Sequence, residues 1–491
     1  MTRIVIVGNG MVGSRFAADL LAADTPGRFQ IDHFGAEDCR PYNRVLLSDV
    51  VSGARDITSI GIPQADHSRL RVHQGVRVAD IDREDRAVVL DNGARVRYDQ
   101  LVLATGSTAR LPQLDGLPPS GELPHGVKTL RTIDDARAIA AASVNARAAV
   151  VLGAGVLGLE VACGLARRGV RATVVHPKAT LMERQLDADA GAVVQATLRD
   201  LDIDQRTEVS AGGVVVADGR LIGVRLTSGE VLDCDLLVIT VGTAPATDLA
   251  RRSGLPVDRG VIVDDDLASP ADRRVFAIGD CAQPDEGMSG LVAQGWSQSR
   301  RLAGRLGGAG GHHVPGPTGD DVVRLKAPGL DVVTMGVCGT ARADQPGHRS
   351  IRVSDPAAGR HIEIVVADDR LAGATCVGAG RLAADLLSTY TLGTPVPRDP
   401  MLLLLDRAAF GLADADSDER VVCRCNNVTL GEIHDCVDAG ASDVDDIAGT
   451  TRAGTGCGSC REELCTLLAR RTDADAAGQA RNPRETSLVT P

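Results

Sequence analysis

Aromatic residues are scarce in this sequence: one Trp, three Tyr and five Phe make up 2% of its 491 residues. Proteins that bind single-stranded nucleic acid stack bases on aromatic side chains, so this composition offers few such platforms. A net charge of -12 would also repel nucleic-acid phosphates and anionic lipid headgroups. We therefore expect neither nucleic acid nor a membrane as a partner. The charge suits docking onto a basic protein face, or it serves solubility alone.

Long apolar runs and a secretory leader are lacking as well. The chain begins almost at once with the strand-like RIVIVG, and its longest apolar stretches, such as Met401 to Leu405, fall far short of the roughly 20 residues of a membrane-spanning helix. We expect a cytoplasmic protein, whose twelve cysteines are thiols or metal ligands rather than disulfides. Its length predicts about three or four domains.

A glycine-rich turn follows the first predicted strand, in RIVIVGNGMVGSRFAADLL. Gly8 permits a tight turn, Gly10 lets the backbone approach a pyrophosphate, and Gly13 lets the following helix pack against the strand. The next strand-like segment, FQIDHFGAE, offers Glu37 near its end for a ribose. The pattern predicts a dinucleotide site.

The same pattern recurs in AAVVLGAGVLGLEVACGLARRG, with Gly153, Gly155 and Gly158. Two dinucleotides are therefore implied. Strands ending in ATG and VGT suit backbone crossings between two nucleotide domains. In FAIGD, Asp280 lies beside a glycine at a strand end, where its carboxylate either accepts hydrogen bonds from a ribityl chain or caps a helix.

Together, these motifs resemble the FAD-dependent pyridine nucleotide-disulfide reductase class over about residues 1 to 310. The resemblance implies an α/β fold with FAD on the first turn, NADH or NADPH on the second, and hydride transfer from nicotinamide to flavin. The residues expected at the FAD are Gly8, Asn9, Gly10, Met11, Val12, Gly13, Glu37, Arg44, Val78, Ala104, Thr105, Gly106, Gly279 and Asp280. Those expected at the nicotinamide nucleotide are Gly153, Ala154, Gly155, Leu157, Gly158, His176 and Gly242.

Several residues depart from that class. A disulfide reductase needs a close cysteine pair beside the flavin, whereas the cysteines of this region are solitary, which argues against disulfide reduction. Cys39 is either a lone peroxide-reducing thiol or, more simply, structural. Related rubredoxin and ferredoxin reductases place a Lys where Asp49 stands, paired with the Glu that matches Glu160. Glu160 is the catalytic candidate near the nicotinamide.

The nicotinamide preference stays open. NADH enzymes usually end the strand after the second turn with a Glu that binds the ribose diol, but VRATVVHPK ends at His176, with Lys178 close by. A neutral His rejects neither NADH nor NADPH, and the alternative is that His176 is simply a partly exposed residue at the strand end.

Four cysteines stand apart near the C-terminus, as the pairs Cys423/Cys425 and Cys457/Cys460. The segment between them predicts two short helices capped by Thr429 and Ser442, with Cys436 and Cys465 at core positions. Zinc and an iron-sulfur cluster both suit four thiolates, but a one-electron carrier is more useful behind a flavin that collects two electrons.

This module resembles the bacterioferritin-associated-ferredoxin type of 2Fe-2S domain, which implies Cys423, Cys425, Cys457 and Cys460 as cluster ligands. The expected fold is then two Rossmann-like domains for FAD and NAD(P), a small α+β module without chemistry that we can name, and a small helical 2Fe-2S domain. The boundaries that we expect are 1–115 and 244–305 (FAD), 116–243 (NAD(P)), 306–320 (a linker with His312 and His313), 321–410 (α+β), 419–470 (2Fe-2S) and 471–491 (flexible tail).

The order of these pieces, with PYNRVLLS and LMERQLD, resembles the electron-transfer subunit of assimilatory nitrate reductases and the N-terminal half of the NAD(P)H nitrite reductase large subunit. Nitrite reductases continue into a sirohaem domain, for which a chain ending at Pro491 leaves no room. We expect electron delivery to a separate assimilatory nitrate reductase. The alternatives are donation to a nitrite reductase, a ferredoxin or rubredoxin reductase, and an NAD(P)H oxidase. The segment from Asp414 to Asp446 is strongly acidic: it contains ten acidic residues and only two basic ones, Arg420 and Arg424. These acids either steer the cluster domain onto a basic partner or simply solvate it.

Overall fold

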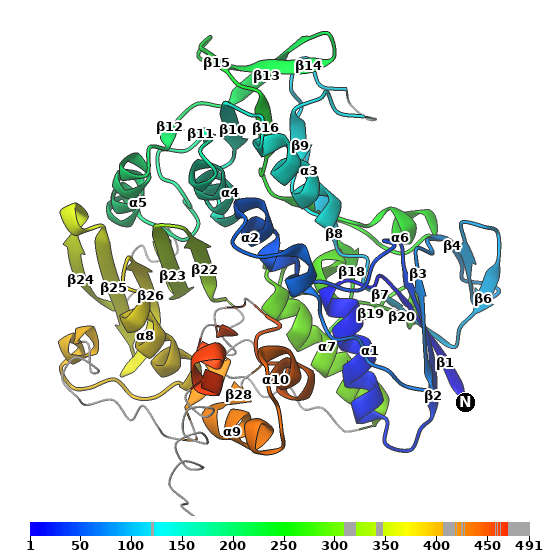
Figure 1. The fold of residues 1–491 in the computed structure, drawn as a ribbon. Coiled ribbons are helices and arrows are strands. Elements are labelled where there is room, and N and C mark those ends of the chain that lie inside the picture. The colour runs from blue at the N-terminus through cyan, green and yellow to red at the C-terminus, as the bar shows by residue number, and fades with distance from the viewer. Residues whose placement is uncertain are drawn as a thin grey trace, which may run out of the picture. The chain divides into compact units, whose positions relative to one another are not determined.

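The computed structural model describes residues 1–118, 122–308, 321–339, 347–405, 418, 420–423, 426, 428–456, 458, 460–461 and 463–469. The chain divides into two compact units, Met1–Asp406 and Arg407–Pro491 (Figure 1). His312, His313 and the tail from residue 471 lie outside the described residues. No helix among the described residues is both long and apolar enough to cross a membrane.

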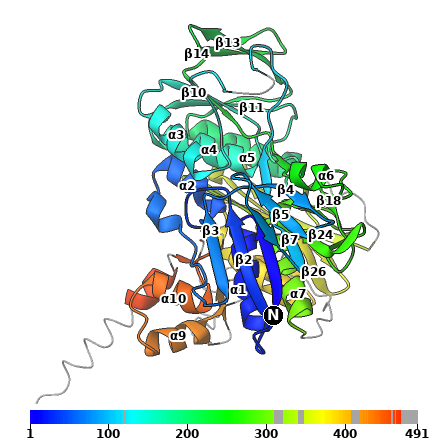
Figure 2. The same cartoon turned by 90° about the vertical axis from the view of Figure 1, so that its right-hand side faces the viewer.

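The first sheet combines strands from two separate parts of the chain. Its order is β19 (Ala268–Ser269), β20 (Asp272–Ala277), β7 (Gln100–Leu103), β1 (Thr2–Val7), β2 (Phe29–Gly35) and β3 (Leu70–Gln74). Every neighbouring pair is parallel except β19 with β20. Parallel strands are covered on both faces, which explains the continuous apolar run of β1. Helices α1 (Met11–Ala23) and α7 (Val292–Gly307) lie side by side (Figures 1 and 2). The linker predicted from residue 306 therefore starts within α7.

The second sheet is fully parallel, in the order β12 (Asp204–Arg206), β11 (Arg171–Val175), β10 (Ala148–Leu152), β16 (Leu236–Ile239) and β9 (Val127–Thr129). Its helices are α3 (Ile133–Ser143), α4 (Val156–Arg167) and α5 (Ala188–Asp200). Strands β8 (Ser107–Ala109) and β17 (Thr243–Pro245) pair with each other where the chain crosses between the two nucleotide domains, as the ATG and VGT motifs predicted.

Smaller elements complete these two domains. They are α2 (Leu47–Ser52), β4 (Val78–Asp82), β5 (Ala87–Leu90), β6 (Arg95–Arg97), β13 (Ala211–Ala217), β14 (Arg220–Leu226), β15 (Val231–Asp233), α6 (Asp248–Arg252), β18 (Val261–Ile262) and β21 (Ala282–Gln283), with the 3-10 helices η1 (Arg44–Leu46), η2 (Ile57–Ile60) and η3 (Gly279–Cys281).

The predicted α+β module is an antiparallel sheet with one long helix. The strand order is β22 (Val323–Ala327), β23 (Leu330–Gly336), β26 (Arg370–Val377), β25 (Arg360–Ala367) and β24 (Arg349–Asp355), accompanied by α8 (Gly380–Leu392), η5 (Pro356–Ala358) and η6 (Pro400–Leu404). Leu325 and Val332 belong to the same buried core as Val161 of α4. Arg352 of β24 forms ion pairs with Asp187 and Asp189 at the start of α5. The module is thus anchored on the second nucleotide domain.

The C-terminal unit contains β27 (Val421–Cys423), β28 (Val428–Thr429) and the two predicted short helices, α9 (Leu430–Asp438) and α10 (Val444–Thr451). Thr429 caps α9, and Glu432 completes the capping box, as predicted. The Ser442 prediction was wrong by one residue: Asp443 caps α10, because its carboxylate accepts from the Asp445 and Asp446 amides. Cys436 is buried as expected, whereas Cys465 is exposed, so its assignment to the core was also wrong.

Candidate functional site

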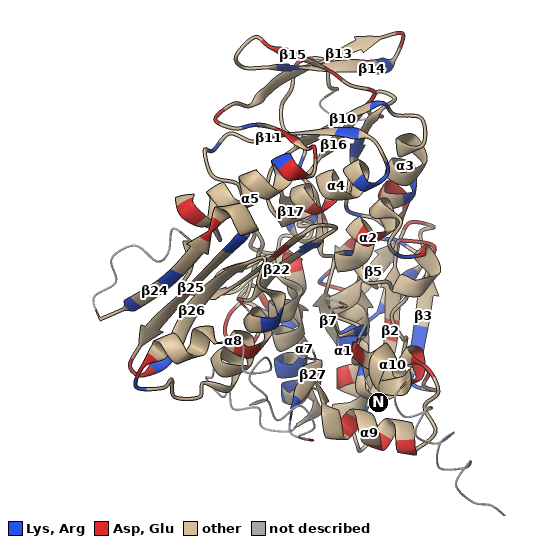
Figure 3. Cartoon of the chain, turned by 60° about the vertical axis from the view of Figure 1, so that its left-hand side comes forward, with Lys and Arg blue, Asp and Glu red and all other residues tan. Residues whose placement is uncertain are grey.

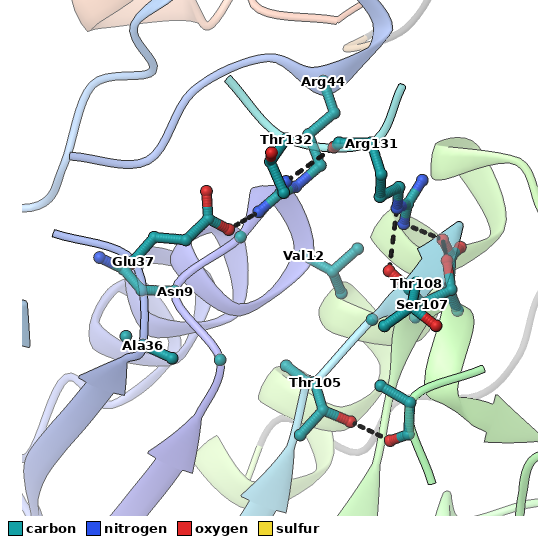
Figure 4. A pocket seen from close by; sticks show the side chains of 18 of the residues that line it. Asn9, Val12, Ala36, Glu37, Arg44, Thr105, Ser107, Thr108, Arg131 and Thr132 are labelled. Carbon is teal, nitrogen blue, oxygen red and sulfur yellow. Dashed lines mark hydrogen bonds and ion pairs between the residues drawn. The ribbon is translucent and has the colours of Figure 1, made fainter. Parts of the chain in front are cut away.

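A cavity of about 1220 Å³ opens at the carboxyl ends of β1, β2 and β7. Crevices at this edge of a parallel sheet are where such folds bind nucleotides. Figure 4 shows Asn9, Glu37, Arg44, Thr105 and Ser107 around it. The lining includes all the residues expected at the FAD other than Gly13: Gly8, Asn9, Gly10, Met11, Val12, Glu37, Arg44, Val78, Ala104, Thr105, Gly106, Gly279 and Asp280.

The first glycine turn has a shape that only glycine allows. Gly8 has a φ of 112°, and a Cβ on it would fall 2.1 Å from the Ala104 carbonyl oxygen. A Cβ on Gly13 would fall 1.9 Å from the Gly8 carbonyl oxygen, whereas one on Gly10 would meet only the Arg44 side chain at 3.9 Å. Helix α1 begins at Met11, so its first amides point toward this open side. The turn therefore fits a pyrophosphate.

Asn9 supports the same conclusion from the side chains. Its Oδ1 and Nδ2 atoms are buried and make no hydrogen bond with the described residues. Buried amide groups normally have partners, so a polar ligand in the cavity would satisfy them. The residues present fit FAD.

Glu37 lies just after β2, where sequence reasoning placed a ribose-binding acid. Its Oε2 accepts a hydrogen bond from the Tyr42 hydroxyl at 2.7 Å, and Arg44 forms an ion pair with its Oε1. Burial raises the pKa of Tyr42, which keeps this hydroxyl a donor. Tyr42 was not predicted as a partner of Glu37, although it stands in the PYNRVLLS motif.

Asp280 faces Arg131 and Ser107 at the other end of the cavity. Its Oδ2 lies 2.7 Å from Arg131 Nη2 and 2.8 Å from Ser107 Oγ. It caps no helix among the described residues, and η3 begins after Ile278 without a side-chain cap, so the alternative interpretation of Asp280 as a helix cap was wrong. Arg131 was not predicted, and no motif marks it: it precedes α3 and reaches Asp280 only through the tertiary fold.

The second glycine turn has nearly the same backbone geometry as the first. Gly153 has a φ of 102°, and a Cβ on Gly158 would fall 1.9 Å from the Gly153 carbonyl oxygen. A Cβ on Gly155 would meet none of the described atoms within 4 Å. Helix α4 begins at Val156, so its amide end is presented in the same way. This turn fits a second dinucleotide.

The His176 ring packs against the backbone of the second turn instead of pointing into the open space beside it. His176 is only 6% exposed, and its Nδ1 accepts a hydrogen bond from the Ala154 amide at 3.3 Å. Its Nε2 is 3.2 Å from a carboxylate oxygen of Glu183. The expectation of a partly exposed residue was therefore wrong: the buried ring supports the turn through the Ala154 amide, and its contact with a ribose stays a prediction.

Glu160 occupies a junction of three elements. On α4, it accepts hydrogen bonds from the Ser48 hydroxyl of α2 at 2.7 Å and from the Lys326 amide of β22 at 3.3 Å. Burial raises the pKa of Glu160 to about 7, and nearby Asp49 acts in the same direction. Asp49 itself pairs with Arg55 at 2.9 Å. The carboxyl group can therefore gain or lose a proton near neutral pH.

The cysteines of the two nucleotide domains lack the lowered pKa of a reactive thiol. Burial and the neighbouring Glu37 raise the pKa of Cys39, and burial raises the pKa of Cys163 and Cys234 to about 12. A reactive cysteine needs the opposite shift. The structural interpretation of Cys39 is favoured.

In the C-terminal unit, two of the four predicted ligands are described. Cys423 ends β27 and Cys460 lies at the start of the last helical segment, and they are 1% and 6% exposed. A hydrogen bond from the Cys460 thiol lowers the pKa of Cys423 to about 6. Cys425 and Cys457 lie outside the described residues, which contain no group of three metal-binding side chains. Two buried thiols that lie within hydrogen-bonding reach of each other fit a metal centre.

Comparisons with known proteins agree with this arrangement. Residues 2–301 match the pyridine nucleotide-disulphide oxidoreductase family, and residues 421–470 match the BFD-like [2Fe-2S] binding domain. The chain is 32% identical to a nitrite reductase [NAD(P)H] and 30% identical to an assimilatory nitrate reductase electron transfer subunit, both of Bacillus subtilis (strain 168). These alignments cover 97% and 98% of this chain but 59% and 61% of the relatives, so the chain spans about three fifths of their length.

The fold also resembles that of putidaredoxin reductase in its covalent complex with putidaredoxin. The TM-score is 0.70 at 23% identity, covering 84% of this chain and 99% of the other. Two dinucleotide domains with a large cavity on the first define a flavin-containing NAD(P)H oxidoreductase. The chain belongs to the pyridine nucleotide-disulphide oxidoreductase family. Its cofactors are FAD and NAD(P)H, and the C-terminal match identifies a 2Fe-2S cluster rather than zinc.

Proposed function

We propose that this chain takes electrons from NAD(P)H through FAD to its 2Fe-2S cluster and delivers them to a separate assimilatory nitrate reductase. The main support for the proposal is that one chain contains both two dinucleotide turns and a four-cysteine module. The similarity to a nitrate reductase electron transfer subunit over 98% of this chain supports the choice of partner. Bound FAD and cluster supply the hydride and one-electron chemistry, whereas the protein supplies the positions.

The cavity residues have defined tasks in this scheme. The α1 amides at the first turn would hold the FAD pyrophosphate, Glu37 would bind the ribose, and Asp280 would bind the ribityl hydroxyls. Glu160 holds or releases a proton beside α2 and β22. The proposal places the protein in the cytoplasm. The ten described cysteines form no disulfide with one another, which is usual in a reducing compartment.

The acidic residues of the C-terminal unit supply a means of docking. Of the ten acids counted in the sequence, Asp414, Asp416 and Glu419 lie outside the described residues; the others are exposed. They include Asp435 and Asp438 on α9. Red segments mark acidic residues on this helix in Figure 3. An acidic face would speed association with a basic partner surface, and salt would slow it.

Reconstitution tests the proposal. The purified protein alone should reduce neither nitrate nor nitrite, and adding an assimilatory nitrate reductase should give NAD(P)H-dependent nitrate reduction. Cys423→Ser should abolish this transfer, whereas Cys465→Ser, at an exposed position, should not. Undiminished transfer in the cluster-free variant, or nitrite reduction by the chain alone, would rule the proposal out.

A nitrite reductase is the second candidate acceptor, because the chain is 32% identical to one over 97% of its length. Parallel assays with a nitrite reductase that lacks its own reductase portion distinguish the two partners. Faster transfer to the nitrite reductase would replace the nitrate reductase in the proposal.

A further inference from the structure

The Asn426 side chain offers a hydrogen-bond donor to the Cys423 sulfur. Its nitrogen Nδ2 lies 3.7 Å from Sγ, and the backbone amides of Gly454 and Asn426 also lower the pKa of the thiol. Because Cys423 is 1% exposed, water has almost no access to compete for the sulfur. A substitution can remove the Asn426 side chain and leave the backbone amides in place.

The orientation of the Asn426 amide is fixed by its other contacts. Nδ2 lies 2.7 Å from the Arg452 carbonyl oxygen and 3.2 Å from Thr455 Oγ1. The Thr455 hydroxyl itself donates to the same carbonyl at 2.8 Å. A carbonyl oxygen only accepts, so exchanging the amide O and N of Asn426 would set two oxygens against each other. The amide nitrogen must face this side, where it also reaches the sulfur.

We propose that Asn426 raises the reduction potential of the 2Fe-2S cluster by donating a hydrogen bond to the ligating sulfur of Cys423. The proposal rests on the cluster of the proposed function. Accepting one electron makes the cluster and its cysteine sulfurs more negative. A hydrogen-bond donor at a sulfur therefore stabilises the reduced form more than the oxidised form. Residues around a metal centre commonly tune it in this way.

The test is a redox titration of the full-length, FAD-loaded protein, following the EPR signal of the reduced cluster. Asn426→Ala should lower the equilibrium constant for reduction about three- to tenfold, which is about 28–59 mV for one electron. Asn426→Asp keeps the side-chain size but loses both donor hydrogens and adds negative charge, so its potential should fall further. Thr450→Val is the matched control: Thr450 is exposed on α10 and its hydroxyl donates to the Asp446 carbonyl, so its loss should leave the potential unchanged.

Resonance Raman spectroscopy separates tuning from a merely structural role. In D2O, the iron-cysteine stretching bands of the wild-type protein should shift, and Asn426→Ala should shift less because one exchangeable donor is gone. Variants that retain iron and acid-labile sulfide but show the wild-type potential and deuterium shift would overturn this proposal and leave the electron route intact. Loss of the cluster from both Asn426 variants would also overturn it, since Asn426 would then serve retention. Zinc without sulfide in the wild-type protein would overturn both proposals.

Discussion

The two glycine turns are nearly identical in backbone and differ in what surrounds them. In both, a Cβ on the third glycine would fall 1.9 Å from the carbonyl oxygen of the first. The first turn opens onto a cavity of about 1220 Å³ with Glu37 at its edge. The second has a buried histidine beneath it. We propose that the glycines meet a backbone requirement shared by both dinucleotides and that the side chains beyond the strand ends select which one binds.

Sheet register makes that comparison residue by residue. Val7 pairs with Phe34 in the first domain, and Leu152 pairs with Val175 in the second. Glu37 lies three residues after Phe34, and Lys178 lies three residues after Val175, so the two residues occupy equivalent positions. Lys178 is exposed. An acid at this position suits a ribose diol, and a cation suits a 2′-phosphate.

The third glycines provide the largest expected effect. Gly13→Ala should reduce FAD content, because the Cβ collides with backbone that cannot move away; an overpacking cost of about 1–3 kcal/mol corresponds to about 5- to 150-fold in affinity. Gly158→Ala should keep FAD but lose reduction by NAD(P)H to a similar extent. Flavin absorbance and stopped-flow reduction measure the two effects.

The middle glycine of the second turn, Gly155, separates an effect on nucleotide binding from an effect on stability. Gly155→Ala places its Cβ in open space, so the thermal stability should stay at the wild-type value while NAD(P)H binding weakens. A loss of FAD from Gly158→Ala, or NAD(P)H reduction at the wild-type rate, would contradict the separate tasks of the two turns.

The helices that follow the two turns differ in a buried acid: α4 carries Glu160, whose titration should make the stability of the protein depend on pH. Glu160 lies seven residues after Gly153, and its counterpart seven residues after Gly8 is Arg15, which pairs with Asp19 at 3.4 Å. Burial raises the folded-state pKa of Glu160 from 4.5 to about 7, so the unfolded chain releases this proton first. Stability should therefore fall between about pH 4.5 and 7, by up to about 3 kcal/mol, and change no further above that range.

Glu160→Gln should remove this pH dependence and raise the unfolding temperature above pH 7 relative to the wild-type protein. Unfolding scans at pH 5 and pH 8 measure it, with Glu84→Gln, at an exposed position, as the control. Equal pH slopes in the wild-type protein and Glu160→Gln would show that Glu160 does not titrate as described.

Lys178 should have the smallest effect. Lys178→Glu places an acid where the first domain has Glu37, so it should favour the ribose diol and repel a 2′-phosphate. We expect the ratio of kcat/KM for NADPH to that for NADH to fall about tenfold, or about 1.4 kcal/mol. Lys128→Glu, at a distant strand of the same sheet, is the charge control. An unchanged ratio would show that Lys178 does not face the nucleotide.

Local patterns predicted the backbone of this site better than its side chains. Strand, glycine turn and helix are adjacent in sequence, so both turns, the domain crossings and the α9 cap could be predicted. Arg131 could not, because it comes from the segment before α3 and meets Asp280 only after folding. His176 was placed at the correct strand end, but sequence periodicity does not reveal that its ring turns under Ala154. Cys465 was misassigned because a short terminal helix has apolar neighbours on both faces.

Anaerobic stopped-flow mixing with NAD(P)H tests the central claim, that electrons enter at the second turn, pass to the flavin and leave through the cluster. Flavin absorbance should bleach first and the cluster should be reduced afterwards. Gly158→Ala should slow both phases together, and Cys423→Ser should keep the first phase and lose the second. Reduction of the cluster before the flavin, or at the wild-type rate in Gly158→Ala, would contradict the account.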